Sequence, residues 1–409
     1  MKKLGFHYGW IVLAVGTFAV FSALGLGRFG YTMVLPAMQA DLNMNNAQAG
    51  LLVTFNMAGY LLFAVLGGAL STRYGSRIVA SAGLVLAGIG MIGTGLAGSF
   101  YTVAVWRWLT GIGSGGNIAV MGLWTAWFSR RKRGRAAGIA VSGSSFALVL
   151  TGWFVPWMSA HLGPSSWQTC WIVFGCVSLL AAAAAYLMLR NRPEELGLNA
   201  IGHASQKRPE ATCPAEPIAW KKVYFSAPVW SLGLVYSAFG FSYVIYMTFF
   251  FKFLVQDGGY APEAAGSLFS LMGWASLFCG VIWGTVSDYI GRRKALAIVY
   301  LIHATAFGLF ALGGFSVCFT LSAVLFGLSA WSIPAVMNAA CGDLLGVRLA
   351  PAALGFITLF FGIGQVVGPF VGGMTADKTG AFPPAFLLAS VVAFLGAVGS
   401  AILIKEKRL

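Results

Sequence analysis

An all-helical membrane protein that crosses the bilayer twelve times is predicted by three features of the 409-residue sequence. Hydrophobic residues make up 58% of the chain and charged residues 9%, whereas a soluble globular protein has about 25% charged residues. The mean hydropathy is +0.81. Apolar runs of about 20 residues, the length that crosses a bilayer as a helix, recur along the whole chain. These features exclude a soluble enzyme, a disordered protein and a disulfide-stapled secreted domain.

Twelve apolar segments are long enough to be spanning helices. At about 24 residues each they use about 290 residues and leave about 120 for loops and tails, which is too few for a sizeable soluble domain. The basic N-terminus precedes an apolar run without a convincing cleavage site, so we expect a retained first span rather than a signal peptide. The predicted spans are 10–37, 46–71, 77–98, 100–125, 134–162, 166–190, 226–253, 262–287, 293–313, 315–342, 351–376 and 382–404.

One long polar gap, which contains four prolines, separates the sixth span from the seventh. Polar, proline-containing stretches between apolar segments are typical of loops and linkers. We therefore expect an N-terminal six-helix half over 1–190, a cytoplasmic linker over 191–225 and a C-terminal six-helix half over 226–409.

Lysine and arginine residues predict the orientation of the spans. With both termini in the cytoplasm, the cytoplasmic loops and tails hold 22 of the 26 basic residues, and the outer loops and their flanks hold only Lys252 and Lys378. This asymmetry predicts a multi-pass protein of the cell inner (plasma) membrane with both termini cytoplasmic. The basic cluster at 130–135 is expected to face an anionic leaflet. The net charge of +15 therefore does not indicate a nucleic-acid partner, because the basic residues are dispersed between spans.

An internal repeat is visible at an offset of 216 residues. The loop after span 2 reads GALSTRYGSR at 68–77, and the loop after span 8 reads GTVSDYIGRR at 284–293. Two six-span halves that share a loop motif predict parallel structural repeats, with a substrate site between them near the membrane midplane.

These loops resemble the G-x-x-x-D-R-x-G-R-R signature of the major facilitator superfamily of transporters. Span 4 carries R-x-x-x-G-x-G from Arg107 to Gly113, which resembles a second motif of that superfamily. Gly134, Gly138 and Gly143 lie where a third, glycine-rich motif is expected. The resemblance covers the whole chain and implies the major facilitator fold, in which two pseudo-symmetric six-helix halves alternate access to a central site.

Two further segments resemble the monocarboxylate and oxalate–formate branch of the superfamily: FHYGW at 6–10 and RPEELG at 192–197. Members of that branch typically carry an arginine in span 8, and some carry a lysine in span 11. Here span 8 has no basic residue, and span 11 has Gln365 instead of a lysine. An anion site would therefore have to lie toward the N-terminal half.

The repeated loop motif is a candidate gate. An acidic residue there can pair with arginines near a helix end and release them when the conformation changes. The second copy is complete, whereas the first has Thr72 at the acidic position, so we expect its ion pair to be absent or weaker. The alternative is that these basic residues only set the topology. The candidate gating residues are Arg73, Arg77, Asp288, Arg292 and Arg293.

Two arginines inside spans are the leading functional candidates, because a charge in the middle of a membrane is costly. They are Arg28 in span 1 and Arg107 in span 4, and no acidic residue occurs between Asp41 and Glu194. A guanidinium stays charged when buried and grips a carboxylate with two parallel hydrogen bonds. The sequence therefore favours a small organic anion. Alternatively, either arginine supports the structure by bonding to helix carbonyls.

Polar and aromatic residues within the spans can complete a binding cavity. The tyrosines of span 7 recur at helical spacing on one side, and their hydroxyls need partners inside a membrane. Simple packing is the competing interpretation of such an aromatic stripe. The candidate substrate-binding residues are Arg28, Tyr31, Asn56, Tyr60, Arg107, Asn117, Tyr236, Tyr243, Tyr246, Trp331, Asn338 and Gln365.

Together these features predict a secondary active transporter of a small organic anion, a monocarboxylate by the branch resemblance, that works by alternating access and proton symport. Anion exchange and efflux of amphipathic drug-like compounds are the alternatives. His303 titrates in a useful range, but we expect it to be packed within the protein. The expected partners are the small-molecule substrate, protons and the lipid bilayer, and the expected oligomeric state is a monomer.

No enzyme activity is expected from the sequence. No Walker A motif is present, and the glycines at 111–116 that match a dinucleotide-binding string lie inside a span. We predict no catalytic residues, no metal site and no cofactor.

Overall fold

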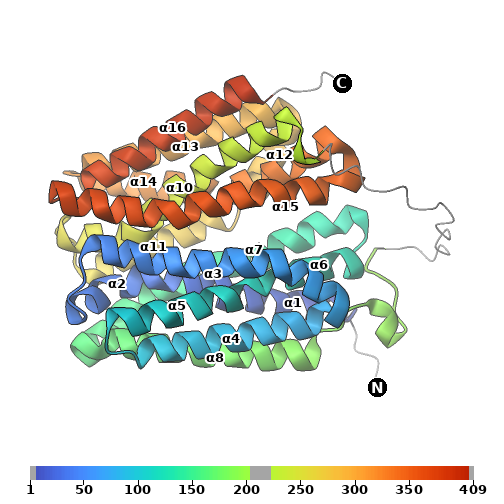
Figure 1. Ribbon diagram of the computed structural model, residues 1–409, viewed down its shortest axis with the longest axis horizontal. Coiled ribbons are helices and arrows are strands. Elements are labelled where there is room, and N and C mark those ends of the chain that lie inside the picture. Colours follow the sequence, from blue (N-terminus) through green and yellow to red (C-terminus); the bar gives the residue numbers. More distant parts are fainter. Residues whose placement is uncertain (1–5, 203–222, 405–409) are drawn as a thin grey trace.

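The computed structural model describes residues 6–202 and 223–404, and the chain within these ranges is almost entirely helical (Figure 1). The prediction of an all-helical protein is confirmed. In the described ranges the β-type pairing consists of an isolated bridge between Phe128 and Ile201. Of the linker expected at 191–225, residues 203–222 lie outside the described part of the chain.

The helices before the linker follow the predicted spans 1 to 6. Span 1 changes from α-helix to π-helix and back without a break, and span 4 is divided in two at Gly116. The elements are α1 (Gly9–Val20), η1 (Phe21–Phe29), α2 (Gly30–Asp41), α3 (Asn46–Tyr74), α4 (Ser76–Gly95), α5 (Phe100–Gly115), α6 (Asn117–Trp127), α7 (Arg130–Leu162), η2 (Gly163–Ser165), α8 (Ser166–Met188) and η3 (Pro193–Leu196).

The helices after the linker correspond to spans 7 to 12, with three differences from prediction. Span 8 is divided between α11 and α12, and span 10 is divided between α14 and α15. The loop expected at 343–350 is helical and joins the end of span 10 to span 11 within α15, because half of this stretch is leucine or alanine, which are strong helix formers. The elements are α10 (Ala227–Gln256), α11 (Pro262–Ser276), α12 (Cys279–Ile290), α13 (Arg292–Leu312), α14 (Ser316–Ser329), α15 (Ser332–Thr379) and α16 (Pro383–Leu403).

Among the described residues, nine helical stretches are by themselves long and apolar enough to cross a membrane. This number is smaller than twelve for structural reasons. The breaks between α5 and α6 and between α11 and α12 leave two spans in shorter pieces, and the short η2 turn merges spans 5 and 6 into one stretch, Lys132–Met188.

Helices α1 to α8, coloured blue to green, gather in the lower part of Figure 1, and α10 to α16, coloured yellow to red, gather in the upper part. Helix α3 packs against α15, and α7 packs against α11. Glycines allow the backbones to meet closely there: a Cβ on Gly50 would lie 2.1 Å from the Pro369 carbonyl oxygen, and one on Gly266 would lie 2.1 Å from the Gly152 carbonyl oxygen.

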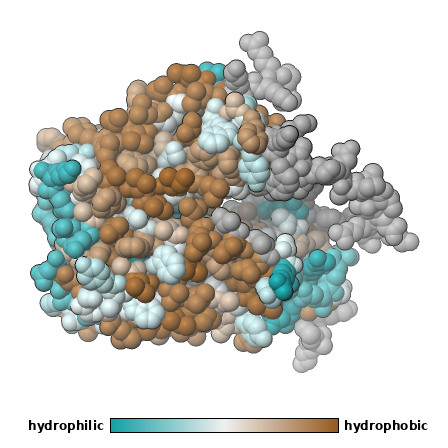
Figure 2. All heavy atoms as spheres, viewed as in Figure 1, coloured by the Kyte–Doolittle hydropathy of each residue, from teal (hydrophilic) through white to brown (hydrophobic). Residues whose placement is uncertain are grey.

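The surface has the polarity of a membrane protein. Figure 2 shows hydrophobic residues across the middle of the molecule and hydrophilic residues gathered toward its two ends. Large apolar side chains are exposed on the surface, among them Leu180 at 65% and Trp153 at 64% exposure. A monomeric soluble protein rarely exposes apolar surface on this scale, so these side chains are expected to face lipid.

Candidate functional site

The first span widens into a nine-residue π-helix, η1, at the position where it carries Arg28. Side chains from α5 hold this widened backbone. The Ser114 hydroxyl donates to the Ala23 carbonyl over 2.9 Å, and Arg107 Nη1 donates to the Gly27 carbonyl over 2.8 Å. π-Helical turns are rare and occur frequently at functional sites. Here the turn determines where the side chain of Arg28 lies.

Arg107 is fully buried inside the protein, with 0% of its surface exposed. Its guanidinium lies 5.0 Å from the ring centroid of Tyr31 and 4.7 Å from that of Trp171. The Asn56 amide donates to the Arg107 backbone carbonyl over 3.0 Å. Although the Nε and Nη2 atoms of Arg107 have no hydrogen-bond partner, the two rings and the Gly27 carbonyl enclose the group. Arg107 therefore supports the π-helical turn and has no accessible surface for a ligand.

Arg28 is half-buried, and its guanidinium lies 4.6 Å from the ring centroid of Tyr60. Its Nε and Nη2 atoms are buried and have no hydrogen-bond partner. These two nitrogens form the edge of a guanidinium that holds a carboxylate with two parallel hydrogen bonds. Within residues 6–202 and 223–404, no carboxylate forms a salt bridge with Arg28. The arrangement can therefore accept an anion.

Two residues from the second half of the chain join Arg28 and Tyr60 in one cluster. The Tyr243 hydroxyl in α10 lies near the Arg28 guanidinium. Gln365 in α15 donates from Nε2 to the Tyr243 hydroxyl oxygen, whereas its Oε1 atom is buried without a partner. We call Arg28, Tyr60, Tyr243 and Gln365 the central cluster. Its members come from spans 1, 2, 7 and 11, so helices on both sides of the linker contribute to it.

Two more of the predicted residues lie at or near this junction of helices. Tyr236 stacks on Phe361 with ring centroids 4.5 Å apart, and Tyr60 lies near it. Trp331 packs against Phe29 of η1 at 5.2 Å, and its Nε1 atom donates to the Ser145 hydroxyl of α7 over 3.3 Å. Trp331 therefore links α15 to two helices of the first half.

The structure does not bring every predicted residue into the central cluster. The Tyr31 hydroxyl donates to the Ala49 carbonyl over 2.8 Å. Asn117 is buried at the start of α6 with no partner for its Oδ1 atom, and Asn338 is exposed. The Tyr246 hydroxyl lies 2.8 Å from the hydroxyl of Ser322 in α14.

The span-7 tyrosines consequently divide between two environments. Tyr243 stacks on Phe239, with ring centroids 4.6 Å apart. Tyr246 is instead surrounded by Phe307, Phe310 and Phe326, and so packs within the second half. His303, expected to be packed, lies fully buried among Phe239, Phe307 and Phe326. Within the described residues, no group of three or more His, Cys, Asp or Glu side chains could hold a metal ion.

The second loop motif forms an ion-pair network around Arg292. Its Nη1 atom lies 2.5 Å from Asp288 Oδ1 and 2.5 Å from the Ser287 hydroxyl, and its Nε atom donates to Asp343 Oδ2 in α15 over 2.9 Å. Arg293 is exposed beside this network. Asp343 is a partner that the sequence motif did not indicate.

The first loop motif uses uncharged partners. Arg77 Nε donates to the Tyr186 carbonyl over 2.6 Å, and the backbone N–H of Arg77 donates to Asn191 Oδ1 over 2.9 Å. Arg73 lies 5.3 Å from the ring centroid of Tyr74. Asn191, in the segment after span 6, therefore gives this motif an uncharged contact.

Sequence reasoning missed a polar network at the opposite end of the bundle. Lys252 of α10 is 4% exposed, and its Nζ atom donates to Gln39 Oε1 and Asn46 Oδ1. Asp377 of α15 accepts from the backbone N–H groups of Asn46 and Ala47 over 3.0 and 2.7 Å at the start of α3, where a helix favours a negative charge. We call Gln39, Asn46, Lys252 and Asp377 the outer polar network, because the distribution of basic residues in the sequence predicts that this end faces outward. The available signal was a lone lysine at the end of an apolar run.

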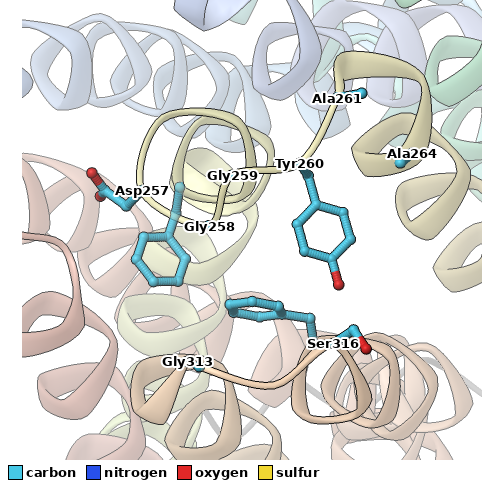
Figure 3. Close-up of a pocket in the computed structure, with 11 residues that line it drawn as sticks. Asp257, Gly258, Gly259, Tyr260, Ala261, Ala264, Gly313 and Ser316 are labelled. Carbon is cyan, nitrogen blue, oxygen red and sulfur yellow. The ribbon is translucent and has the colours of Figure 1, made fainter.

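Two pockets open near this end. One of about 440 Å³ is lined by the outer polar network residues Gln39, Asn46 and Lys252. The other, of about 570 Å³, lies between the loop after α10 and the loop after α13. Figure 3 shows Tyr260 pointing into its space and the Asp257 carboxylate directed away from Tyr260. No member of the central cluster lines either pocket.

Comparison with known proteins identifies relatives along the whole chain. The family model described as "Uncharacterised MFS-type transporter YbfB" matches residues 20–401. The hexuronate transporter of Bacillus subtilis is 26% identical over 90% of this chain and 88% of its own length. Monocarboxylate transporter 11 of Mus musculus is 26% identical over 94% of this chain and 84% of its own. The crystal structure of a D-xylose–proton symporter superposes with a TM-score of 0.77 at 15% identity, covering 98% of this chain and 99% of that one.

Proposed function

Because this chain belongs to the family of MFS-type transporters, we propose that it carries a small organic anion, a monocarboxylate, across the membrane by proton-coupled symport. The protein is a multi-pass membrane transporter with the major facilitator fold. Members of this family move solutes and are not enzymes. The substrate class, the coupling ion and the residues that bind the substrate are the proposed parts.

The observation that carries the proposal is the unpaired edge of Arg28. Two N–H donors of a guanidinium lie buried there without a partner. A buried charge that lacks a partner is costly, and an arriving carboxylate would satisfy both donors at once. A cationic drug would instead add a second positive charge beside Arg28, so this geometry disfavours efflux of amphipathic cations.

The names of the two similar transporters support an anionic substrate. Both hexuronate and monocarboxylates carry a carboxylate group, and each relative covers more than four-fifths of its own length in the match. Proton symport is proposed because a carboxylate is the anion of a weak acid and can cross together with a proton. Anion exchange would use the same binding residues and differs only in the step that returns the empty transporter.

Alternating access requires that the two ends of the bundle open in turn. We propose that the halves 1–190 and 226–409 rock as units, with both termini cytoplasmic in an inner membrane and the protein acting as a monomer. In the described arrangement the outer polar network bridges α2 and α3 to α10 and α15. The Thr32 hydroxyl also donates to the Met247 carbonyl over 2.7 Å. These contacts support an outward-closed conformation.

Flux through proteoliposomes tests the proposal. Radiolabelled three- and four-carbon monocarboxylates are added outside vesicles that contain the purified protein, with an alkaline interior. Symport predicts uptake above the equilibrium level that a protonophore abolishes, with protein-free vesicles as the control. Uptake that occurs only when the vesicles contain an anion would indicate anion exchange instead of proton symport. If no carboxylate enters under either condition while a cationic dye is moved, the anion proposal is wrong.

A further inference from the structure

The first loop motif holds an arginine at the edge of the bundle. Arg77 lies in the first turn of α4, and its guanidinium lies 4.7 Å from the ring centroid of Tyr186, an exposed residue of α8. Its Nε atom donates to the Tyr186 carbonyl over 2.6 Å, and its terminal nitrogens carry further N–H donors. The ring and the carbonyl thus fix the guanidinium at the end of α8.

No described carboxylate pairs with Arg77. Thr72 stands at the acidic position of this motif, and within residues 6–202 and 223–404 Arg77 forms no salt bridge. Glu195 lies in the segment that contacts Arg77 through Asn191, but its Oε1 atom accepts from the backbone N–H groups of Asn191 and Arg192 over 3.1 and 3.2 Å. A negatively charged ligand can therefore approach Arg77 without displacing a protein carboxylate.

Exposed apolar side chains continue from this arginine along α4 and α8. The two helices pack together and run side by side at the lower edge of Figure 1. A Cβ on Gly88 of α4 would lie 3.0 Å from the Gly175 carbonyl oxygen of α8, so the two backbones are close. The exposed apolar residues recur at helical spacing, so that each helix presents one such face. They are Ile78, Val85 and Ile89 in α4 and Leu180 and Leu187 in α8.

We propose that this surface binds an anionic phospholipid of the cytoplasmic leaflet, with its phosphate on Arg77 and its acyl chains along α4 and α8. The planar fork of an arginine matches the oxygens of a phosphate group. The excess of basic residues at this end predicts that it faces the cytoplasm, where the leaflet carries a negative surface potential. Arg292 of the second loop motif is instead already paired with two carboxylates. The inference does not depend on which substrate the protein carries.

Native mass spectrometry of the purified full-length protein measures this binding. The protein is titrated with phosphatidylglycerol and with phosphatidylcholine that has the same acyl chains. The wild type should bind the first phosphatidylglycerol about 5-fold more tightly, because only this lipid has a net negative charge. Arg77→Gln should weaken phosphatidylglycerol binding by about 5-fold and change phosphatidylcholine binding less. Arg77→Lys should fall between them, because it keeps the charge and loses the fork.

Lys294→Gln is the matched control. It removes one positive charge from an exposed position in the first turn of α13, the helix that corresponds to α4 in the 216-residue repeat. It should leave the affinity for phosphatidylglycerol unchanged. An equal loss of affinity in Lys294→Gln would show general attraction between charges and would overturn the assignment of Arg77.

Glycerophosphoglycerol, the same headgroup without acyl chains, separates a lipid from a free phosphodiester. In molar excess it should not displace bound phosphatidylglycerol, because it cannot contact the apolar faces of α4 and α8. Displacement would indicate a site for a free anion and would refute the lipid site. Equal affinity of the wild type for the two lipids, or unchanged phosphatidylglycerol affinity in Arg77→Gln, would refute it as well.

Discussion

Replacing Lys252 by methionine should open the outer end of the transporter. Lys252 of α10 is the charged donor that joins this helix to Gln39 of α2 and Asn46 of α3. Methionine retains the apolar stem and removes the ammonium group. The substitution therefore weakens the outward-closed state without leaving a cavity in the bundle.

The size of the effect follows from the contacts that are lost. A hydrogen bond to a charged group contributes about 1.5–3 kcal/mol. Two such bonds are lost, but Gln39 and Asn46 keep their own bond of 3.2 Å, and their side chains can reach water when the end opens. A net shift of about 1.5–2 kcal/mol toward the open state is expected, which corresponds to about a 10- to 30-fold change in the equilibrium constant.

Distance distributions between spin labels report this change. Tyr101 at the start of α5 and Val317 at the start of α14 are 79% and 71% exposed and lie outside the outer polar network. With labels at these positions, in protein whose native cysteines have been replaced, Lys252→Met should increase the population at long distance. Lys378→Met removes the same charge from an exposed position and should leave the distribution unchanged. An unchanged distribution in Lys252→Met would refute the reasoning.

Three further predictions concern other parts of the bundle. Tyr246→Phe should lower the free energy of unfolding by about 1 kcal/mol through the loss of one buried hydrogen bond, and an unchanged melting temperature would show that this bond is unimportant. Asp288→Asn should alter the conformational equilibrium by no more than about 1 kcal/mol because the Asp288 side chain is 64% exposed. The double variant Asp288→Asn/Asp343→Asn should give a larger shift in the same spin-label experiment. If the single variant Asp288→Asn shifts the equilibrium as much as the double variant, Asp343 does not contribute to the network around Arg292. Gly111→Ala should reduce the yield of monodisperse protein in size-exclusion chromatography, because its Cβ would lie 2.0 Å from a backbone oxygen of α3. Gly280→Ala should be tolerated, because a Cβ there meets nothing within 4 Å. Equal yields of the two variants would refute the packing argument.

The composition and periodicity of the sequence were sufficient to predict the helices, because a membrane span needs a long apolar run whatever its neighbours are. The roles of the two buried arginines required the structure. Both were found from their charge alone, but the carbonyl that Arg107 binds belongs to Gly27, 80 residues earlier, in a π-helical turn for which the sequence carries no clear signal. Only the three-dimensional contacts distinguish the sealed Arg107 from the half-buried Arg28.

Helical periodicity likewise predicts which residues share one face of a helix, but it does not predict which neighbouring helix packs against that face. Tyr243 and Tyr246 are three residues apart, yet one meets Gln365 of α15 and the other meets Ser322 of α14. The outer polar network was missed for a related reason. Counting charges placed Lys252 at the flank of an outer loop, and only tertiary contact shows that its ammonium group is buried between α2, α3 and α10.

Carboxylate affinity in folded Arg28→Ala protein tests the central claim most directly. Loss of a charge-assisted hydrogen-bonded pair should weaken binding by about 1.5–3 kcal/mol, or about 10- to 150-fold. Arg28→Lys should fall between the wild type and Arg28→Ala, because it keeps the charge and loses the two-pronged geometry. The uncharged amide of the same acid should lose much less affinity than the carboxylate on going from the wild type to Arg28→Ala, because it lacks the negative charge. Wild-type carboxylate affinity in a monodisperse, thermally stable Arg28→Ala protein would contradict the account.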